Sequence, residues 1–456
     1  MTAKVEILPQ VANRAVPGSV REVAVLAFPA VLQTLSDTVM QVVDSAIVGR
    51  LGVTELGAVG FGGVWTWTML VAFVGAATGV QTFVSQAYGA GEARRCGQWV
   101  WQGIYALLPF AVAWIVLIEL AFEPLMRLLG PSPELRVLAA SYAHARLCGA
   151  PAVVVAVALT SFFRGVGDTR TPLMATVVAN LLNAAMAYGL VFGRFGLPAW
   201  GVAGAGAATA LSNWTYASVM LAMFLRRRLV EEHGTWPVRP NRVAMRRYVR
   251  TSVPVGGQWV LDMISFALVS TIIARMGNVH MAASQAMIQL LSLSFMQAFG
   301  IAIASGALVG RYVGARDLVA AARSHRSAMQ LGLLLATLVA LLFITAPDML
   351  LSIFTSDATV IALGRPLLAI GALFQLIDAV GIIAGGSLRG AGDTRWPFVV
   401  QASLAWFLRL PLVYGFGVVL GWGVTGAWFG ELLFVAALGS AWLLRFRAGV
   451  WRTVRI

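Results

Sequence analysis

The sequence is a succession of apolar stretches, each long enough to cross the hydrocarbon layer of a bilayer as one helix of roughly 20 residues. Only 11% of the residues are charged, against about 25% in a typical soluble domain, so the chain could not cover a soluble surface of this size. The runs are continuous rather than alternating, unlike the strands of a membrane barrel. The sequence therefore predicts an all-α polytopic membrane protein. Twelve spans are expected, at about 24–48, 58–83, 99–122, 136–162, 172–193, 202–225, 251–274, 283–309, 327–346, 361–387, 397–417 and 424–444.

The basic residues predict the orientation of these spans. A cytoplasmic N-terminus places 25 of the 33 lysines and arginines in or beside the inside connections, as the positive-inside rule requires. An even number of spans then puts both termini in the cytoplasm, and we expect a multi-pass protein of the cell (inner) membrane. Because topology accounts for the net charge of +14, no nucleic-acid partner is expected. The first twenty residues lack the apolar core of a cleavable signal peptide, so the first span is expected to remain as an anchor.

The chain contains an internal repeat with an offset of 225 residues. The motif RGVGDTR at 164–170, followed by Pro172, recurs as RGAGDTR at 389–395, followed by Pro397 (389 − 164 = 225). The glycines permit a tight turn and Asp or Thr before proline suits a helix start, so the structural interpretation of the motif is favoured over a direct substrate role. The same offset separates six further pairs: Pro29/Pro254, Gln33/Gln258, Asp37/Asp262, Gly52/Gly277, Gly75/Gly300 and Gly89/Gly314.

The repeat predicts two halves of six spans with the same orientation in the membrane. The expected organisation is a cytoplasmic N-terminal segment 1–23, a first half 24–225, a cytoplasmic linker 226–250, a second half 251–444 and a cytoplasmic C-terminal tail 445–456. Parallel repeats are typical of transporters, in which two similar bundles move about a site between them. A duplicated structural scaffold without transport is the alternative.

Carboxylates within the apolar runs are the candidate functional groups, because each costs about 3 kcal/mol to place in hydrocarbon and tends to face a cavity. Such a group can take up a proton or a partly dehydrated cation and release it later. The alternative is an acid paired with a buried arginine, for which Arg146 and Arg409 are available. The acids are Asp37, Asp44, Asp262, Asp378, Glu119 and Glu431, of which the last has no evident partner and Glu119 is near the outer end of its span.

Helical spacing groups some of these residues. Asp37 and Asp44 are seven positions apart and share one face of the first span. Asp378 shares a face with Gly381 and Gly385, whose spacing predicts close contact with another helix.

Several other classes of function find little support. The chain has no GxxxxGK[ST] nucleotide loop, and its four histidines and two cysteines show no metal-ligand spacing. No cofactor, metal site or nucleophile–base constellation of an intramembrane enzyme is therefore expected. Sixteen methionines, fifteen tryptophans and twenty-three phenylalanines could line an adaptable pocket, although packing and interfacial anchoring are the commoner roles of such residues.

The sequence resembles the multidrug and toxic compound extrusion (MATE) transporters, especially their NorM-type branch. The resemblance runs from about Phe28 to the last span. It is carried by VDSAIVGRLG at 43–52, by the run from Ile377 to Gly390, and by the paired RGxGDTRxP motifs. It implies twelve transmembrane helices in an N-lobe and a C-lobe around a central cleft. It also implies efflux of drug-like, often cationic, small molecules by antiport against Na⁺ or H⁺. We expect the protein to function as a monomer in the lipid bilayer.

The resemblance also assigns coupling-ion residues. Asp44 matches the family's acid in the first helix, Asp378 the acid of the tenth, and Asp262 an acid of the seventh that the NorM-type branch usually fills with glutamate. Asn183 matches an asparagine near the first-helix acid, whereas the next polar position is Ala187 here, and a family tyrosine before the tenth-helix acid is Phe374. Asp37 and Thr209 complete the predicted set. The sequence leaves open whether both halves bind cations or only the first. The nearest rival function is a flippase for lipid-linked precursors, and a non-transporting receptor is a further alternative.

Overall fold

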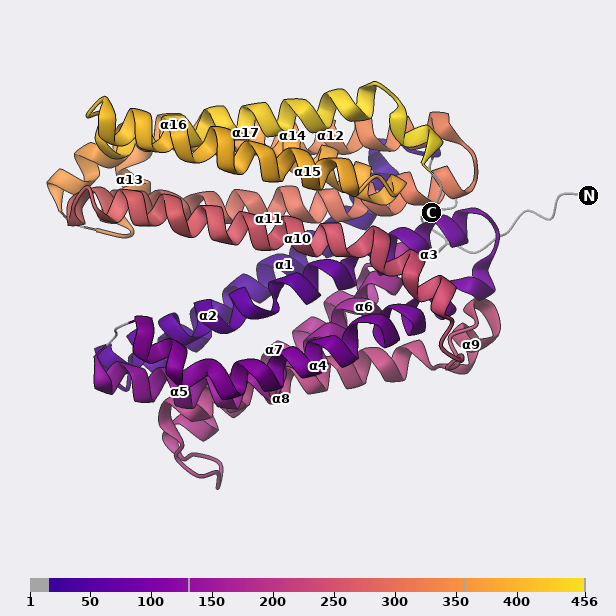
Figure 1. Ribbon diagram of the computed structural model, residues 1–456, viewed down its shortest axis with the longest axis horizontal. Coiled ribbons are helices and arrows are strands. Elements are labelled where there is room, and N and C mark those ends of the chain that lie inside the picture. The colour runs from indigo at the N-terminus through magenta and orange to yellow at the C-terminus, as the bar shows by residue number, and fades with distance from the viewer. Residues whose placement is uncertain (1–15, 130–131, 356, 455–456) are drawn as a thin grey trace, which may run out of the picture. The chain divides into compact units, whose positions relative to one another are not determined.

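The computed structural model describes residues 16–129, 132–355 and 357–454, which are helical with short connections and contain no β-strand. Long rods of helix dominate the structure (Figure 1). The helices of the first half are α1 (Val20–Gly49), α2 (Val53–Thr78), α3 (Val80–Gly89), η2 (Ala93–Arg95), α4 (Cys96–Leu129), α5 (Pro133–Leu147), α6 (Ala150–Val166), α7 (Arg170–Phe192) and α8 (Gly201–Phe224). After α9 (Arg227–His233), the second half has α10 (Arg242–Ala274), α11 (Asn278–Gly314), α12 (Leu318–Thr345), α13 (Pro347–Ser352), α14 (Ala358–Ala391), α15 (Arg395–Leu404), η3 (Ala405–Arg409), α16 (Leu410–Tyr414), η4 (Gly415–Val419), α17 (Gly423–Arg447) and η5 (Val450–Thr453).

These helices confirm the predicted fold class of an all-α polytopic membrane protein. Among the described residues, ten helical stretches are long and apolar enough to cross a membrane, and α5 with α6 forms an eleventh span bent by 47°. The remaining predicted span is α8, a helix of 24 residues whose glycines, serines and threonines lower its hydropathy. Each of the twelve apolar stretches identified in the sequence is therefore helical.

The two halves differ in the fourth span of each repeat. In the second half this span is the continuous helix α14, 358–391. The equivalent residues of the first half, 133–166, are broken between α5 and α6 at Cys148 and Gly149. Pro151 explains the break, because it has no N–H to donate to the carbonyl of Leu147. The bend leaves Arg146 in the last turn of α5.

The repeated RGxGDTR motif forms the same turn twice. Gly167 and Gly392 each cap a helix with φ of 91°, in the left-handed region that glycine adopts without a steric cost. In both copies the glycine N–H donates to the motif arginine's carbonyl, and the following aspartate N–H donates to the carbonyl five residues earlier. This arrangement is the Schellman turn that ends a helix. The structural role predicted for the motif glycines is confirmed.

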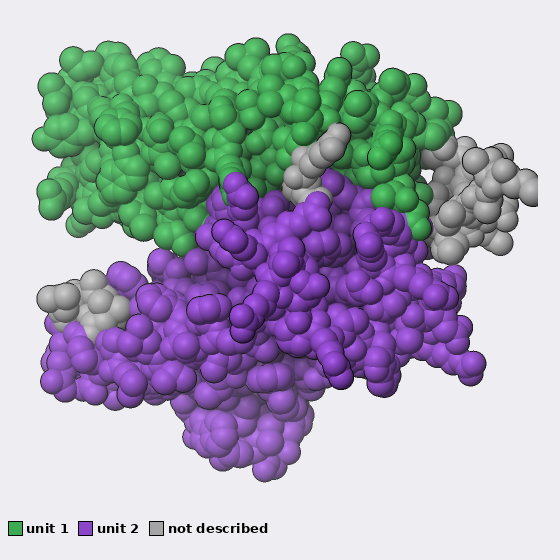
Figure 2. Space-filling view, turned by 45° about the vertical axis from the view of Figure 1, so that its right-hand side comes forward, with its two compact units in different colours: residues 1–31, 89–91, 257–456 green, residues 32–88, 92–256 purple. Residues whose placement is uncertain are grey.

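The chain divides into two compact units, coloured separately in Figure 2: unit 1 (residues 1–31, 89–91 and 257–456) and unit 2 (residues 32–88 and 92–256). The chain passes from unit 1 to unit 2 within α1, after Val31, and returns within α10, after Gly256. These two positions are related by the repeat offset (31 + 225 = 256). A proline, Pro29 or Pro254, lies two residues before each.

Helix α14 is the centre of unit 1, where it contacts α11, α12 and α17. The predicted glycine seam is confirmed there. A Cβ on Gly381 would lie 3.2 Å from the Gly439 Cα, and a Cβ on Gly385 would lie 2.7 Å from the Trp442 ring. Both contacts are to α17. In unit 2 the corresponding packing joins α5 and α6 to α8, and α7 to α8.

Candidate cation-binding sites in the two halves

Asp44 is on α1 in unit 2 and is half-buried. Its Oδ1 atom is buried and accepts no hydrogen bond from the described residues. Arg146 on α5 is the cation whose charge acts on Asp44, while the Arg146 Nη1 donates a 2.7 Å hydrogen bond to the Tyr142 hydroxyl. A buried carboxylate oxygen without a donor costs free energy unless a cation or a proton satisfies it. Asp44 therefore has the chemistry of a monovalent cation or proton site.

Asn183 on α7 offers a second acceptor of the same kind. The residue is 3% exposed, and its Oδ1 has no hydrogen-bond partner within the described part of the chain. Packing brings the relevant helices together: Ile47, one turn after Asp44, contacts the cluster that includes Ala187, one turn after Asn183, and Ala208 on α8. The helices that carry Asp44 and Asn183 thus converge in unit 2.

Thr209 and Asp37, the other residues predicted for the first half, are placed differently. The Thr209 hydroxyl donates a 3.0 Å hydrogen bond to the Ala205 carbonyl of its own helix, so its proton already has an acceptor. Asp37 is exposed and feels the charge of Arg164, while the Asn180 side-chain amide donates to the carbonyl and hydroxyl of the neighbouring Ser36. Asp37 and Asp44 share a helix face, yet each has its own arginine.

Sequence reasoning missed a buried polar network beside Asp37. The Gln33 Nε2 donates 3.1 Å hydrogen bonds to the Thr176 and Tyr216 hydroxyls, and its Oε1 accepts 2.9 Å from Arg164 Nη2. Tyr216 in turn lies 2.8 Å from the Thr160 hydroxyl. The signal was present in the sequence, because Gln33 is a polar residue at a repeated position within a span. Arg164, the arginine of the first RGxGDTR motif, therefore makes a side-chain hydrogen bond inside unit 2 in addition to its backbone role in the motif turn.

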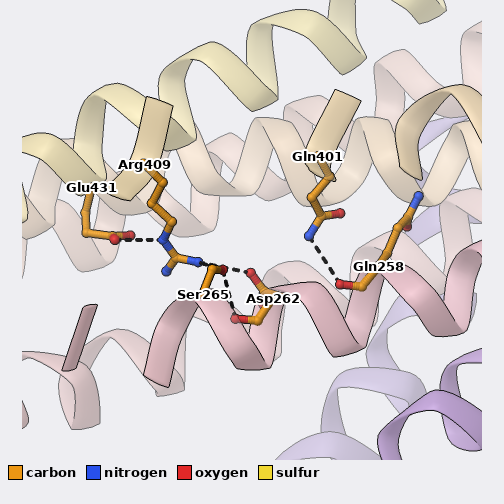
Figure 3. Close-up of polar contacts among 6 residues, drawn as sticks. All are labelled: Gln258, Asp262, Ser265, Gln401, Arg409 and Glu431. Carbon is orange, nitrogen blue, oxygen red and sulfur yellow. Dashed lines mark hydrogen bonds and ion pairs between the residues drawn. The ribbon is translucent and has the colours of Figure 1, made fainter. Parts of the chain in front are cut away.

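In unit 1 the acids converge on Arg409 (Figure 3). The Arg409 Nε lies 2.7 Å from Glu431 Oε1, and its Nη1 lies 3.5 Å from Asp262 Oδ1. Nη1 also donates to the Ser265 hydroxyl, and the guanidinium carbon is 4.9 Å from the Phe434 ring centroid. Arg409 and Glu431 are 5% and 4% exposed, whereas the Asp262 side chain is 58% exposed. The partner of Glu431, which the sequence left unnamed, is this arginine.

Asp378 on α14 belongs to the same electrostatic group, because the charges of Asp262, Arg409 and Glu431 all act on it. Arg409 is presented by η3, a π-helical stretch within the eleventh span. The equivalent stretch of the first half, 180–184, is part of the regular helix α7. π-Helical segments re-aim side chains and are frequent at functional sites. One turn before Asp378, the Phe374 ring packs edge-on against Trp428 with centroids 5.8 Å apart.

The remaining ionisable residues singled out from the sequence have structural partners. Glu119 lies 2.7 Å from His144 Nδ1. In the first motif Asp168 Oδ1 accepts hydrogen bonds from the N–H groups of Arg170 and Thr171 and so caps α7. In the second motif Asp393 instead receives a 2.9 Å hydrogen bond from Arg445 Nε. The aspartate of the second copy therefore has an arginine partner on α17.

A multi-pass helical protein with two similar halves, each carrying carboxylates inside its spans, has the architecture of a membrane transporter. The MatE family model matches this chain twice, at residues 29–189 and 254–414. The two matches are separated by the repeat offset (29 + 225 = 254) and together cover more than half of the chain. The chain belongs to the MatE (MATE) family, whose members are transporters and not enzymes.

Curated relatives of the NorM type match over almost the full length. A probable multidrug resistance protein NorM of Xanthomonas campestris pv. campestris is 30% identical over 94% of this chain and 94% of that protein. The Thermotoga maritima protein of the same description is 28% identical over 96% of this chain and 94% of that protein.

Solved structures share the fold. A MOP superfamily transporter from Pyrococcus furiosus, described as having a binding pocket of reverse polarity, has a TM-score of 0.88 at 18% identity and covers 98% of this chain and all of that chain. A variant of the Vibrio cholerae MATE transporter VcmN has a TM-score of 0.86 at 19% identity, with 94% of this chain and 97% of that chain covered.

Proposed function

We propose that this chain is a secondary active multidrug efflux transporter that exports drug-like, often cationic, organic compounds by antiport against Na⁺ or H⁺. The observation that carries the proposal is the pair of unsatisfied buried acceptors in unit 2, Asp44 Oδ1 and Asn183 Oδ1. The coupling ion binds in the Asp44 region and favours one conformation of an alternating-access cycle. It can shift that equilibrium only by its differential affinity for the two states. The description of the relatives as multidrug resistance proteins supports the substrate class.

The charges around the two sites favour a cationic cargo. Three arginines, Arg146, Arg164 and Arg409, act on the acids Asp37, Asp44, Asp262, Asp378 and Glu431. Carboxylates therefore outnumber arginines, and a cationic organic compound is stabilised where an anionic headgroup is repelled. This balance disfavours the rival function of a flippase for lipid-linked precursors.

We also propose a location in the cell (inner) membrane, with both termini cytoplasmic and the monomer as the functional form. Both ends of the described chain lie beside the start of α12 within unit 1. Arg323 Nη1 donates 3.1 Å to the Pro17 carbonyl, and the His325 ring lies 4.0 Å from the Phe446 ring, on which Trp451 stacks. Two ends beside one helix terminus are on one side of the membrane, and the arginine distribution favours the cytoplasm.

The test is efflux of a fluorescent organic cation from proteoliposomes under separately imposed Na⁺ and proton gradients. We expect one gradient to drive transport in the parent protein and Asp44→Asn to abolish it. Asp348→Asn is the matched control, because this carboxylate is exposed and pairs with Arg365 at the surface. Absence of transport under either gradient, with the protein correctly inserted, overturns the proposed function. Full gradient-driven transport by Asp44→Asn moves the coupling site elsewhere in the chain.

A further inference from the structure

The two halves treat their intramembrane acids in different ways. In unit 2, Asp44 keeps a buried oxygen without a hydrogen-bond donor from the described residues, and Arg146 acts on it through its charge alone. In unit 1, a guanidinium contacts two carboxylates directly, at 2.7 Å and 3.5 Å. The first half therefore leaves an acceptor for an external cation at Asp44, whereas the second half supplies a guanidinium that contacts Glu431 and Asp262.

Arg409 is held in the manner of a bound organic cation. Its nitrogens meet the Glu431 and Asp262 carboxylates and the Ser265 hydroxyl, and the Phe434 ring covers its planar group at 4.9 Å. Carboxylates together with an aromatic face are the usual environment of a desolvated guanidinium. Four helical elements contribute, because Asp262 is on α10, Arg409 on η3, Glu431 and Phe434 on α17, and Asp378 on α14.

The placement of Arg409 follows from a departure from the repeat. The position equivalent to Arg409 in the first half is Ala184 (409 − 225 = 184), which carries no charge. The π-helical turn that presents Arg409 is likewise absent from the equivalent residues, since 180–184 lie in the regular helix α7. The arginine and the backbone that aims it thus occur together in the second half and are both missing at the matching position of the first.

From this asymmetry we infer that Arg409 is a tethered counter-ion that takes the place of a coupling cation in the second half. Asp262 and Asp378 then do not bind the coupling ion, and coupling is confined to the Asp44 region. This inference rests on the proposed antiport function, because it concerns the ion that drives that antiport. It answers the question that the sequence left open, whether both halves or one bind a cation, in favour of the first half alone.

The first arm of the test uses purified protein and needs no transport. Thermal unfolding is followed in NaCl and in choline chloride for the parent, Arg409→Gln and Arg409→Lys. We expect Na⁺ to stabilise Arg409→Gln more than it stabilises the parent, because removal of the tethered charge exposes the acids of unit 1 to an external cation. Arg409→Lys keeps a cation there and should show no gain, and Asp262→Asn added to Arg409→Gln should remove the gain. Equal Na⁺ responses in Arg409→Gln and the parent overturn the inference.

The second arm uses proteoliposomes and leaves Arg409 unchanged, so it decides the matter even if Arg409→Gln does not fold. For Asp262→Asn we expect the half-saturating concentration of the driving ion to change by less than about threefold, whatever the maximal rate. Loss of gradient dependence in Asp262→Asn, while Asp44→Asn retains it, overturns the inference and places coupling in the second half. If no gradient drives transport by any variant, the proposed function is wrong. The effect of Na⁺ on the thermal unfolding of Arg409→Gln then still tests the role of Arg409.

Discussion

Arg409 and Glu431 form an ion pair of 2.7 Å between two side chains that are each about 5% exposed. Twenty-two residues separate them along the chain, and neither is close in sequence to Asp262, which the same guanidinium contacts. Removing one partner of a buried pair leaves the other charge uncompensated, whereas removing both need not destabilise the fold.

We therefore predict that Glu431→Gln lowers the stability of the protein by about 3–5 kcal/mol, the usual cost of breaking a buried pair. The double variant Arg409→Met with Glu431→Met should recover part of that loss, because it removes both charges. Thermal unfolding in detergent measures both effects. The exposed pair Arg365 and Asp348 is the control, since Asp348→Asn should leave the stability almost unchanged. A Glu431→Gln protein as stable as the parent would contradict the structural role of the pair.

A second prediction concerns the contact between α14 and α11. A Cβ on Gly390 would overlap the Gly306 backbone, which cannot move as a flexible side chain can. Gly390→Ala should therefore destabilise the protein by about 1–3 kcal/mol or more through overpacking. Gly60→Ala is the matched control, because nothing lies within 4 Å of a Cβ at this position in α2. Equal unfolding temperatures for the two variants would show that α14 and α11 do not approach as described.

The repeated glutamines should differ in importance. Gln33 makes side-chain hydrogen bonds of 2.9–3.1 Å to Arg164, Thr176 and Tyr216, whereas the Gln258 Nε2 makes a 3.4 Å bond to the Thr394 carbonyl. Gln33→Leu leaves several buried polar groups without a partner, at a cost of roughly 1–3 kcal/mol. We expect Gln258→Leu to cost less. Side-by-side unfolding of the two variants checks the order, and the reverse order would contradict it.

The connection between the two halves should contribute a pH-dependent stability through His233. Burial lowers the pKa of His233 below its ordinary value of 6.5, and the charge of Glu232 opposes this shift only in part. The neutral ring packs against Phe162, with centroids 5.8 Å apart. Because the unfolded chain binds the proton more readily, this stability is present above pH 6.5 and is lost as the pH falls through and below that value.

The measurement compares unfolding temperatures at about pH 8 and about pH 5.5, on either side of the ordinary histidine pKa, in the parent and in His233→Phe, which keeps an aromatic ring but cannot be protonated. We expect the parent to lose more stability on acidification than His233→Phe. Parallel losses in the two proteins would mean that His233 is not the group responsible.

Much of this structure follows from local features of the sequence. The twelve helical stretches, the offset of 225 residues, the motif turns at Gly167 and Gly392 and the seam at Gly381 and Gly385 all depend on composition and spacing over a few helical turns. Such patterns act on the backbone wherever the segment lies, because a bilayer forces an apolar span to satisfy its own hydrogen bonds as a helix. The acids inside the spans were identifiable for the same reason, since their cost in hydrocarbon depends on residue type.

The partners of those acids could not be predicted from the sequence and follow from the packing of the helices. The sequence suggested Arg146 and Arg409 as possible partners without indicating which acid each would meet. In the structure Arg146 acts on Asp44, and Arg409 contacts Glu431 and Asp262. The neighbour of Asp37 is Arg164. A break at Pro151 and a π-helical turn at 405–409 aim two of these arginines. The positions of the helices and of the charges can be read from the sequence. Which charges meet depends on how separate helices pack and rotate, and those long-range contacts have no signature in local spacing.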